Sequence, residues 1–161
     1  MSVLDSLQTR AAASPARIVL SEGHDPRIVA AAVSAVEAKI ATIILVGPTA
    51  DITRQLSNIG SAPSDAIRIE DPATSALTAE VAETYFEIRQ HKGVSIEVAE
   101  KQARDPLVFA AMLVRNGHAD GTVGGAVATT SDTVRAALQV IGKAKTAPLV
   151  SSFFLMVLPE D

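Results

Sequence analysis

RIVLSEGHDPR, residues 17–27, gives the first clear indication of the fold class. Residues 18–20 form a short apolar run with polar residues directly after it, a pattern typical of a buried parallel strand. Asp25 and Pro26 then predict the start of a helix, because a carboxylate can cap the first turn and proline suits its fixed φ. The stretch therefore predicts a strand, a turn and a helix, which is one βα unit.

The same alternation continues along the chain, with Asp-Pro, Gly-Pro or Asn-Gly pairs between the segments. The expected strands cover residues 18–20, 42–46, 66–69, 121–124 and 148–158. The expected helices cover residues 26–36, 52–59, 72–92, 95–104, 107–116 and 131–141. The last strand is the most hydrophobic and is expected at the centre of the sheet. This order predicts a single α/β domain over residues 1–161, with an open, mostly parallel sheet and helices on both faces.

The composition indicates a packed protein with a mildly acidic surface. Of the 161 residues, 48% are hydrophobic and 3% aromatic, so the chain can bury a core through small side chains. The formal net charge of −4 argues against general binding of nucleic acid or of an anionic membrane surface. Individual arginines would therefore have to hold any anionic ligand.

Several classes of site and location are disfavoured by what the sequence lacks. It contains no cysteine, which excludes disulfides, thiolate zinc sites and a cysteine nucleophile. Its histidines, His24, His91 and His118, are far apart and lack ligand spacing, so we expect no metal. The N-terminus does not resemble a signal peptide, and no run reaches the ~18 apolar residues typical of a membrane span. We expect a cytoplasmic protein that needs no cofactor.

A glycine-rich and hydroxyl-rich turn follows the expected strand at 121–124 and is the first candidate site. Gly124 and Gly125 would let the backbone approach a ligand closely. Thr129, Thr130 and Ser131 place three hydroxyl groups at the start of the next helix. Free N–H groups and the helix dipole favour an anion at such a position. The turn therefore predicts a phosphate-sized site.

Arg135 would belong to the same site, because it follows Ser131 by one helical turn and its side chain leans toward the helix start. The alternative is purely structural: the glycines form a tight turn, the hydroxyls cap the helix, and Arg135 pairs with Asp132 on a solvated face. No Gly-Lys-Ser/Thr follows the glycines, so the turn is not a Walker A loop. Spacing alone leaves the two interpretations open.

The turn after the first strand is a second candidate, since it gathers Glu22, His24, Asp25 and Arg27. The cap role is sufficient to explain Asp25. Arg27 is poorly placed near a helix N-terminus unless it meets an anion or a carboxylate. Arg89, near the end of its helix, occupies a position where a basic residue is usually just solvated.

Three segments, taken in order, resemble the N-terminal part of phosphate acetyltransferases. They are RIVLSEGHDPR near the start, DPLVFAAMLVRNGHADGTVGGAVATTSDTVRAALQVIG in the middle and VSSFFLMVLPED at the end. The resemblance implies a fold akin to the isocitrate and isopropylmalate dehydrogenases, and a cytoplasmic, usually dimeric enzyme. It also implies conversion of acetyl-CoA and phosphate to acetyl phosphate and CoA, with these as substrates and no metal in the chemistry.

The resemblance also assigns residues. Two arginines that family members use for anion and CoA phosphate binding match Arg135 in TTSDTVR and Arg89 in YFEIRQHKG. The Gly124-Gly125 and Thr129-Thr130-Ser131 turn would line the same cleft. The family's catalytic Ser-Arg pair and Asp belong to a second domain and would lie beyond residue 161. We therefore expect the N-terminal part of a longer two-domain enzyme, with little or no activity on its own.

Other interpretations of the same resemblance stay open. Similar domains are fused to malic enzymes, where they imply a non-catalytic module that senses acetyl-CoA. A phosphate butyryltransferase would share the same pattern, because half a sequence does not settle the acyl length. The chain could also be a truncated product that associates through its final apolar strand.

Overall fold

The structure, a computed structural model, describes residues 2–152 and 154–157. The strands in this part of the chain are β1 (Ala16–Leu20), β2 (Ala41–Val46), β3 (Ile67–Glu70) and β4 (Gly121–Val123). The helices are α1 (Val3–Ala13), α2 (Pro26–Glu37), α3 (Thr49–Asn58), α4 (Thr78–Arg89), α5 (Ile96–Gln102), α6 (Pro106–Arg115) and α7 (Thr130–Val140). A short 3-10 helix, η1 (Gln90–Lys92), follows α4.

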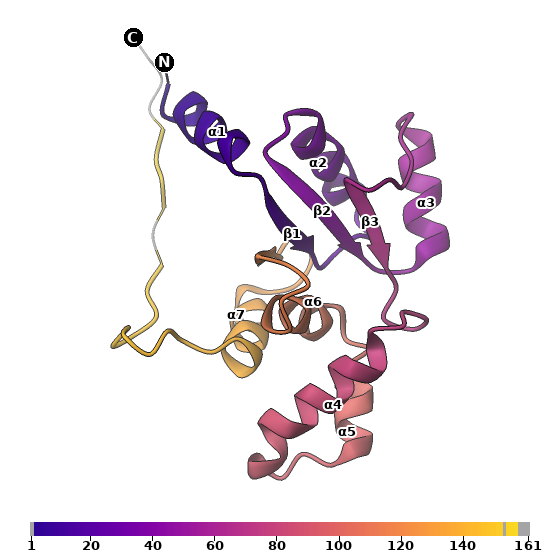
Figure 1. Cartoon of the computed structure of the whole chain (residues 1–161), viewed down its shortest axis with the longest axis vertical. Helices are drawn as coiled ribbons and strands as arrows, with labels where there is room; N and C mark the ends of the chain where they lie inside the picture. Colours follow the sequence, from indigo (N-terminus) through magenta and orange to yellow (C-terminus); the bar gives the residue numbers. More distant parts are fainter. Residues whose placement is uncertain (1, 153, 158–161) are drawn as a thin grey trace.

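The strands form one open sheet in the order β3-β2-β1-β4, and every pair of neighbours is parallel. The chain therefore winds outward from β1 to β3 and then returns to place β4 on the other side of β1 (Figure 1). At the ends of the paired strands, Leu20 of β1 lies opposite Val123 of β4. This reversal of winding is a topological switch point, and ligands of open α/β sheets bind outside the carboxyl ends of the strands there.

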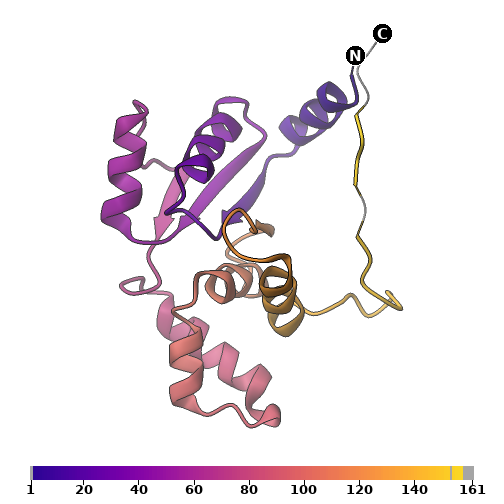
Figure 2. The same ribbon diagram turned by 180° about the vertical axis from the view of Figure 1, so that it is seen from behind.

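Helices cover both faces of the sheet, which confirms the predicted α/β class. On one face, α2 and α3 bury Val29, Ile52 and Leu56 against alternate residues of β1, β2 and β3. On the other face, α6 packs on β1 and β2, with α4, α5 and α7 completing the layer. Figure 2 shows α4 and α5 as a pair that projects from this second layer.

One expected helix start is wrong. Asp71 and Pro72 do not begin α4; the helix starts at Thr78 instead. The Asp71 carboxylate accepts hydrogen bonds from the N–H groups of Ala73 and Thr49, so it closes a turn and ties that turn to α3. A capping carboxylate is used here to join two segments rather than to start a helix.

The expected central strand at 148–158 is also wrong for the residues that the structure describes. Residues 148–152 and 154–157 form no strand and pair with none of β1 to β4. Phe154 is 90% and Met156 78% exposed, and Figure 1 shows this segment extending away from the sheet. Local apolarity favours an extended run, but a strand also needs a neighbour for its N–H and C=O groups. Residues 153 and 158, which belong to the same expectation, lie outside the described residues.

Within the described ranges, no helix combines the length and the apolarity needed to cross a membrane. The same residues contain no cluster of three or more histidine, aspartate or glutamate side chains placed to hold a metal ion.

Candidate functional site at the carboxyl ends of β1 and β4

The turn from β1 into α2 is built by local sequence signals. Gly23 leaves room for the backbone to turn, since a Cβ there would lie 2.8 Å from Ile52 Cδ1 and 2.9 Å from the Val46 carbonyl oxygen. Asp25 caps α2 by accepting the N–H of Arg27 at 2.9 Å, and Pro26 occupies the first turn as predicted. This tight turn places Glu22 and Arg27 within hydrogen-bond distance of the residues that follow β4.

Residues 124–129, the β4–α7 loop, face this turn across the switch point. A Cβ at Gly124 would lie 2.5 Å from Ser21 Oγ, so the glycine permits close approach of the two strand ends. Gly125 adopts a φ of +103°, which side chains rarely tolerate. The packing and backbone conformation of the protein are therefore sufficient to explain why glycine stands at both positions.

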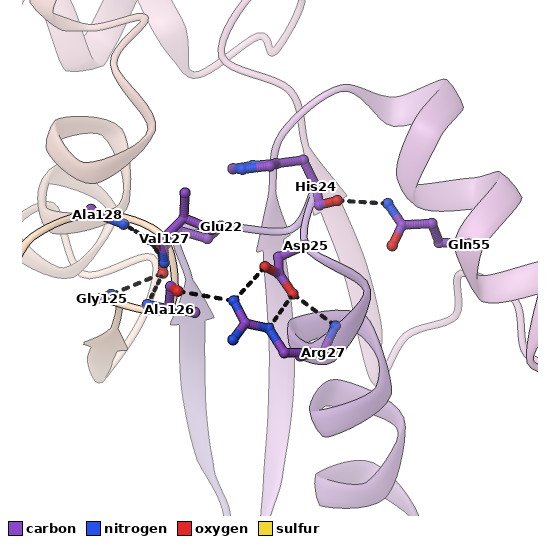
Figure 3. Close-up of polar contacts among 9 residues, drawn as sticks. All are labelled: Glu22, His24, Asp25, Arg27, Gln55, Gly125, Ala126, Val127 and Ala128. Carbon is purple, nitrogen blue, oxygen red and sulfur yellow. Dashed lines mark hydrogen bonds and ion pairs between the residues drawn. The ribbon is translucent and has the colours of Figure 1, made fainter.

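Glu22 joins the two segments. Its carboxylate accepts four backbone hydrogen bonds from consecutive residues of the loop, Gly125, Ala126, Val127 and Ala128, at 2.6–2.8 Å (Figure 3). Burial by itself would raise the pKa of Glu22, but these N–H groups together hold it below its ordinary value. The anion that the loop binds in this structure is therefore the chain's own side chain.

Arg27 holds the loop from its other side. Its guanidinium donates to the Ala126 carbonyl oxygen at 2.9 Å and to Asp25 Oδ2 at 2.8 Å (Figure 3). The carboxylate partner required for an arginine near a helix start is thus Asp25. The backbone carbonyl oxygen of His24 accepts a hydrogen bond from the Gln55 side chain. Among the described residues, no hydrogen bond joins the His24 ring to the loop.

The start of α7 keeps some hydrogen-bonding capacity for a ligand. Thr129 caps the helix by accepting the N–H of Asp132. Among the described residues, the N–H groups of Thr130 and Ser131 have no hydrogen-bond partner. The predicted free N–H groups therefore exist at the first two helical positions, whereas those of residues 125–128 are already occupied by Glu22.

Arg135 makes the contacts expected from both interpretations of the sequence, one with Ser131 at the helix start and one with Asp132. Its side chain reaches back to the helix start and donates to Ser131 Oγ at 3.2 Å, as the spacing predicts. It also forms an ion pair with Asp132 at 2.8 Å and is 59% exposed. Arg135 also lines a hollow of about 250 Å³ together with Asp105 and Gln139. Arg135 is thus an accessible cation beside open donors, with an internal carboxylate as its present partner.

Arg89 lies apart from these contacts. It is the last residue of α4 and is half-buried, and its Nε is buried without a hydrogen-bond partner among the described residues. No hydrogen bond or ion pair found within those residues joins it to the β4–α7 loop or to Arg135. Of the seven residues that the glycine-rich turn and the resemblance assign to a binding site, six therefore lie in the β4–α7 loop and α7, and Arg89 lies apart from them at the end of α4.

Ser21 is a residue that the sequence analysis missed. Its hydroxyl is buried, has no partner in the described part of the chain and lines a small cavity of about 90 Å³ beside Gly124 and Thr133. Its position directly after a buried strand was the available signal. The same signal predicts Glu22 as a candidate, but it does not predict that the carboxylate binds the N–H groups of residues 125–128.

The sheet order defines a class: this is a doubly wound α/β protein with a switch point between β1 and β4. Proteins of this class bind ligands outside the carboxyl ends of the strands at such a point. The family described as "Phosphate acetyl/butaryl transferase" matches residues 2–161. The chain belongs to this family of phosphate acyltransferases.

Named relatives agree with this assignment. The phosphate acetyltransferase of Paracoccus denitrificans is 46% identical over 157 residues, which cover 98% of this chain and 45% of that protein. The phosphate acetyltransferase of Clostridium acetobutylicum is 39% identical over 160 residues, 99% of this chain and 48% of that protein. A crystal structure of a phosphotransacetylase from Streptococcus pyogenes superposes with a TM-score of 0.82 at 34% identity, over 94% of this chain and 46% of that one. The chain thus spans about half the length of these relatives.

Proposed function

We propose that this chain supplies one side of the site at which a phosphate acetyltransferase converts acetyl-CoA and phosphate to CoA and acetyl phosphate. Membership of the family over residues 2–161 is the observation that carries the proposal. CoA, phosphate and their acetyl derivatives act as substrates in this proposal, and no further cofactor takes part. We also propose that residues 1–161 are one α/β domain of a two-domain, cytoplasmic and homodimeric enzyme, as the resemblance implies.

The start of α7 supports a role in holding the anionic part of a substrate. Arg135 offers a charged donor, and Thr130 and Ser131 offer hydroxyl groups and two open N–H groups at the positive end of the helix. A phosphate group there would replace Asp132 as the partner of Arg135. Gly124, Gly125 and Thr129 act in this proposal by shaping the loop, and Arg89 contacts a CoA phosphate from a separate position.

Acyl transfer needs more than these groups. The thiol must lie beside the acyl carbonyl, a base must accept its proton, and positive charge must stabilise the phosphate as the acyl group moves. The residues of this chain supply the last of these. The resemblance implies that the Ser-Arg pair and Asp belong to a second domain, so we propose that the 161 residues alone bind substrate with little turnover.

A paired assay and titration test the proposal. CoA-dependent formation of acetyl phosphate is measured on the 161-residue chain, and CoA and inorganic phosphate are titrated calorimetrically. A charge-assisted contact contributes about 1.5–3 kcal/mol, so Arg135→Ala should weaken anion binding about 10- to 150-fold. Arg54→Ala is the matched control, because Arg54 also pairs with an aspartate three residues away and is 68% exposed.

The outcomes separate clearly. Equal binding by the Arg135→Ala and Arg54→Ala variants would remove Arg135 from the site. Absence of CoA and phosphate binding in the unmodified chain would overturn the proposed function, and full turnover would overturn the proposal that the chain is inactive alone. Parallel titrations with acetyl-CoA and butyryl-CoA decide the acyl length, because the family description includes both acyl groups.

A further inference from the structure

The carboxylate of Glu22 is enclosed by the loop that leads to the proposed anion site. Oε2 accepts the N–H groups of Gly125 and Ala126 at 2.8 and 2.7 Å, and Oε1 accepts those of Val127 and Ala128 at 2.8 and 2.6 Å. Glu22 is only 4% exposed. Four consecutive N–H groups that converge on one point form a backbone anion nest, and here a side chain of the protein fills it.

The chemistry of this nest suits an ionised carboxylate. An ionised carboxylate only accepts hydrogen bonds and has two oxygens, each of which serves two donors here. Glutamine would turn an NH₂ group toward two of the N–H donors, which would lose two acceptor contacts and set donors against each other. Alanine would leave all four N–H groups without their partner.

The nest lies directly before α7 in the chain. The four N–H donors precede Thr129, the cap of α7, directly in sequence. In the Ala126–Val127 peptide, the N–H group donates to Glu22 and the carbonyl oxygen accepts a hydrogen bond from Arg27. Glu22 and Arg27 therefore bind the loop through both its N–H groups and a carbonyl oxygen. The first turn of α7 comes directly after this hydrogen-bonded segment.

We propose that Glu22 is a positioning residue: it fixes the β4–α7 loop so that Thr130, Ser131 and Arg135 meet the anionic substrate without reordering. Glu22 does not contact the substrate in this inference, which rests on the proposed function. Its near-complete burial supports a permanent internal role over one in which phosphate displaces it. The lowered pKa of Glu22 is consistent with a carboxylate that stays ionised at neutral pH.

The test combines loop order with ligand binding in the full chain. Amide hydrogen exchange at residues 125–128 is followed by NMR in Glu22→Gln and Glu22→Ala, and inorganic phosphate is titrated into each. We expect these amides to exchange at least about tenfold faster relative to core amides, and phosphate affinity to fall by a similar factor. Acetate matches the atoms that Glu22→Ala removes, so adding acetate should restore the slow exchange of the same four amides.

The control is Glu70→Gln. Glu70 also ends a strand and accepts hydrogen bonds from Arg68 and Ser75, but it does not touch the loop. This variant should leave the exchange of residues 125–128 and the phosphate affinity unchanged.

Distinct results overturn the two proposals. Unchanged loop amides in Glu22→Gln, or unchanged phosphate affinity despite a loosened loop, would overturn the positioning role while the proposed function stands. Tighter phosphate binding in Glu22→Ala would also overturn it, because Glu22 would then be a competitor for the ligand. Failure of the unmodified chain to bind either CoA or phosphate would overturn the proposed function, and the amide measurement would still decide whether Glu22 orders the loop.

Discussion

Gly124 is explained by packing within the protein, because a side chain at this position would meet Ser21. The sequence predicts that Gly124 permits close approach of a ligand, but in the structure the Ser21 side chain lies where a Cβ of residue 124 would point. A Cβ at position 124 would lie 2.5 Å from Ser21 Oγ and 3.7 Å from Ser21 Cβ. The clash therefore concerns a single hydroxyl oxygen.

This geometry predicts a stability effect that a second substitution reverses. Gly124→Ala should lower the free energy of unfolding by about 1–3 kcal/mol, the usual range for an overpacked core position. Adding Ser21→Ala should recover most of the loss, because the remaining Cβ contact is an ordinary one. Gly121→Ala is the control, since its Cβ would meet only Ile18 Cδ1 at 3.4 Å. Urea unfolding measures all four proteins, and an equal loss in the single and double variants would contradict the prediction.

Asp25 predicts an acid-dependent change in stability. The Arg27 guanidinium, followed by the Arg27 N–H, lowers the pKa of Asp25 to about 2. A carboxyl with a depressed pKa in the folded state stabilises that state above its unfolded pKa of about 4, and this contribution is lost as the pH falls toward 2. Arg27 is largely exposed, so solvent screens the ion pair and only the direction of the effect is predicted.

The comparison for Asp25 is with Asp25→Asn, because asparagine can still cap α2 but carries no charge. The unmodified protein should unfold at a higher urea concentration than the variant at pH 7, and the difference should shrink between pH 4 and pH 2. A difference that is constant over this range would contradict the role of the charge.

At the scale of elements, α6 is the most deeply buried helix among those described. Phe109, Met112 and Leu113 have no exposed surface, and the helix packs against β1, β2, α4 and α7. A helix that is apolar on all sides is expected in a protein interior. Its packing therefore supports both the sheet and the helix that carries Arg135.

Truncation in α6 should accordingly be costly. We expect Phe109→Ala to lower the free energy of unfolding by about 3–5 kcal/mol, as large-to-small substitutions in cores do. Val134→Ala on the exposed side of α7 should change it by less than about 1 kcal/mol, because Val134 is partly solvated already. Equal urea midpoints for the two variants would contradict the central position of α6.

Local sequence patterns predicted most helices and strands, but the same pattern did not have the same structural role at every position. Asp-Pro correctly predicts the starts of α2 and α6, where the backbone N–H groups that bond to the carboxylate all belong to the first helical turn. At Asp71 the same carboxylate also has the Thr49 N–H within reach, so it closes a turn. The apolar run after residue 148 failed as a strand for a related reason, since pairing depends on a neighbour that the local pattern does not specify.

At the scale of the whole molecule, the two halves of the site were each visible in the sequence but their contact was not. The turn at Glu22 and the turn at Gly124 both follow strands, which places them at the same edge of a parallel sheet. Strand order decides whether they are neighbours, and no local pattern contains that order. The pairing of β4 with β1 is what brings them together.

The N-terminal helix contributes little to this arrangement. None of the residues described in α1 is buried, and Figures 1 and 2 both show it standing away from the two packed layers. Removing residues 2–14 should change the free energy of unfolding by less than about 0.5 kcal/mol, a range typical of surface changes. Thermal unfolding and the amide spectrum of residues 125–128 check this, and a loss comparable to that of Phe109→Ala would contradict it.

The contact between Glu22 and the β4–α7 loop has a consequence for how the protein folds. It joins residues 103 to 106 positions apart in the chain. Contacts of such long range form slowly, because a long loop must close before they contribute. During synthesis Glu22 emerges well before its four partners, and it has no nest to fill until β4 has been made. We therefore expect the proposed anion site to become ordered only after β4 has paired with β1, and chains in which this pairing is absent should bind inorganic phosphate more weakly.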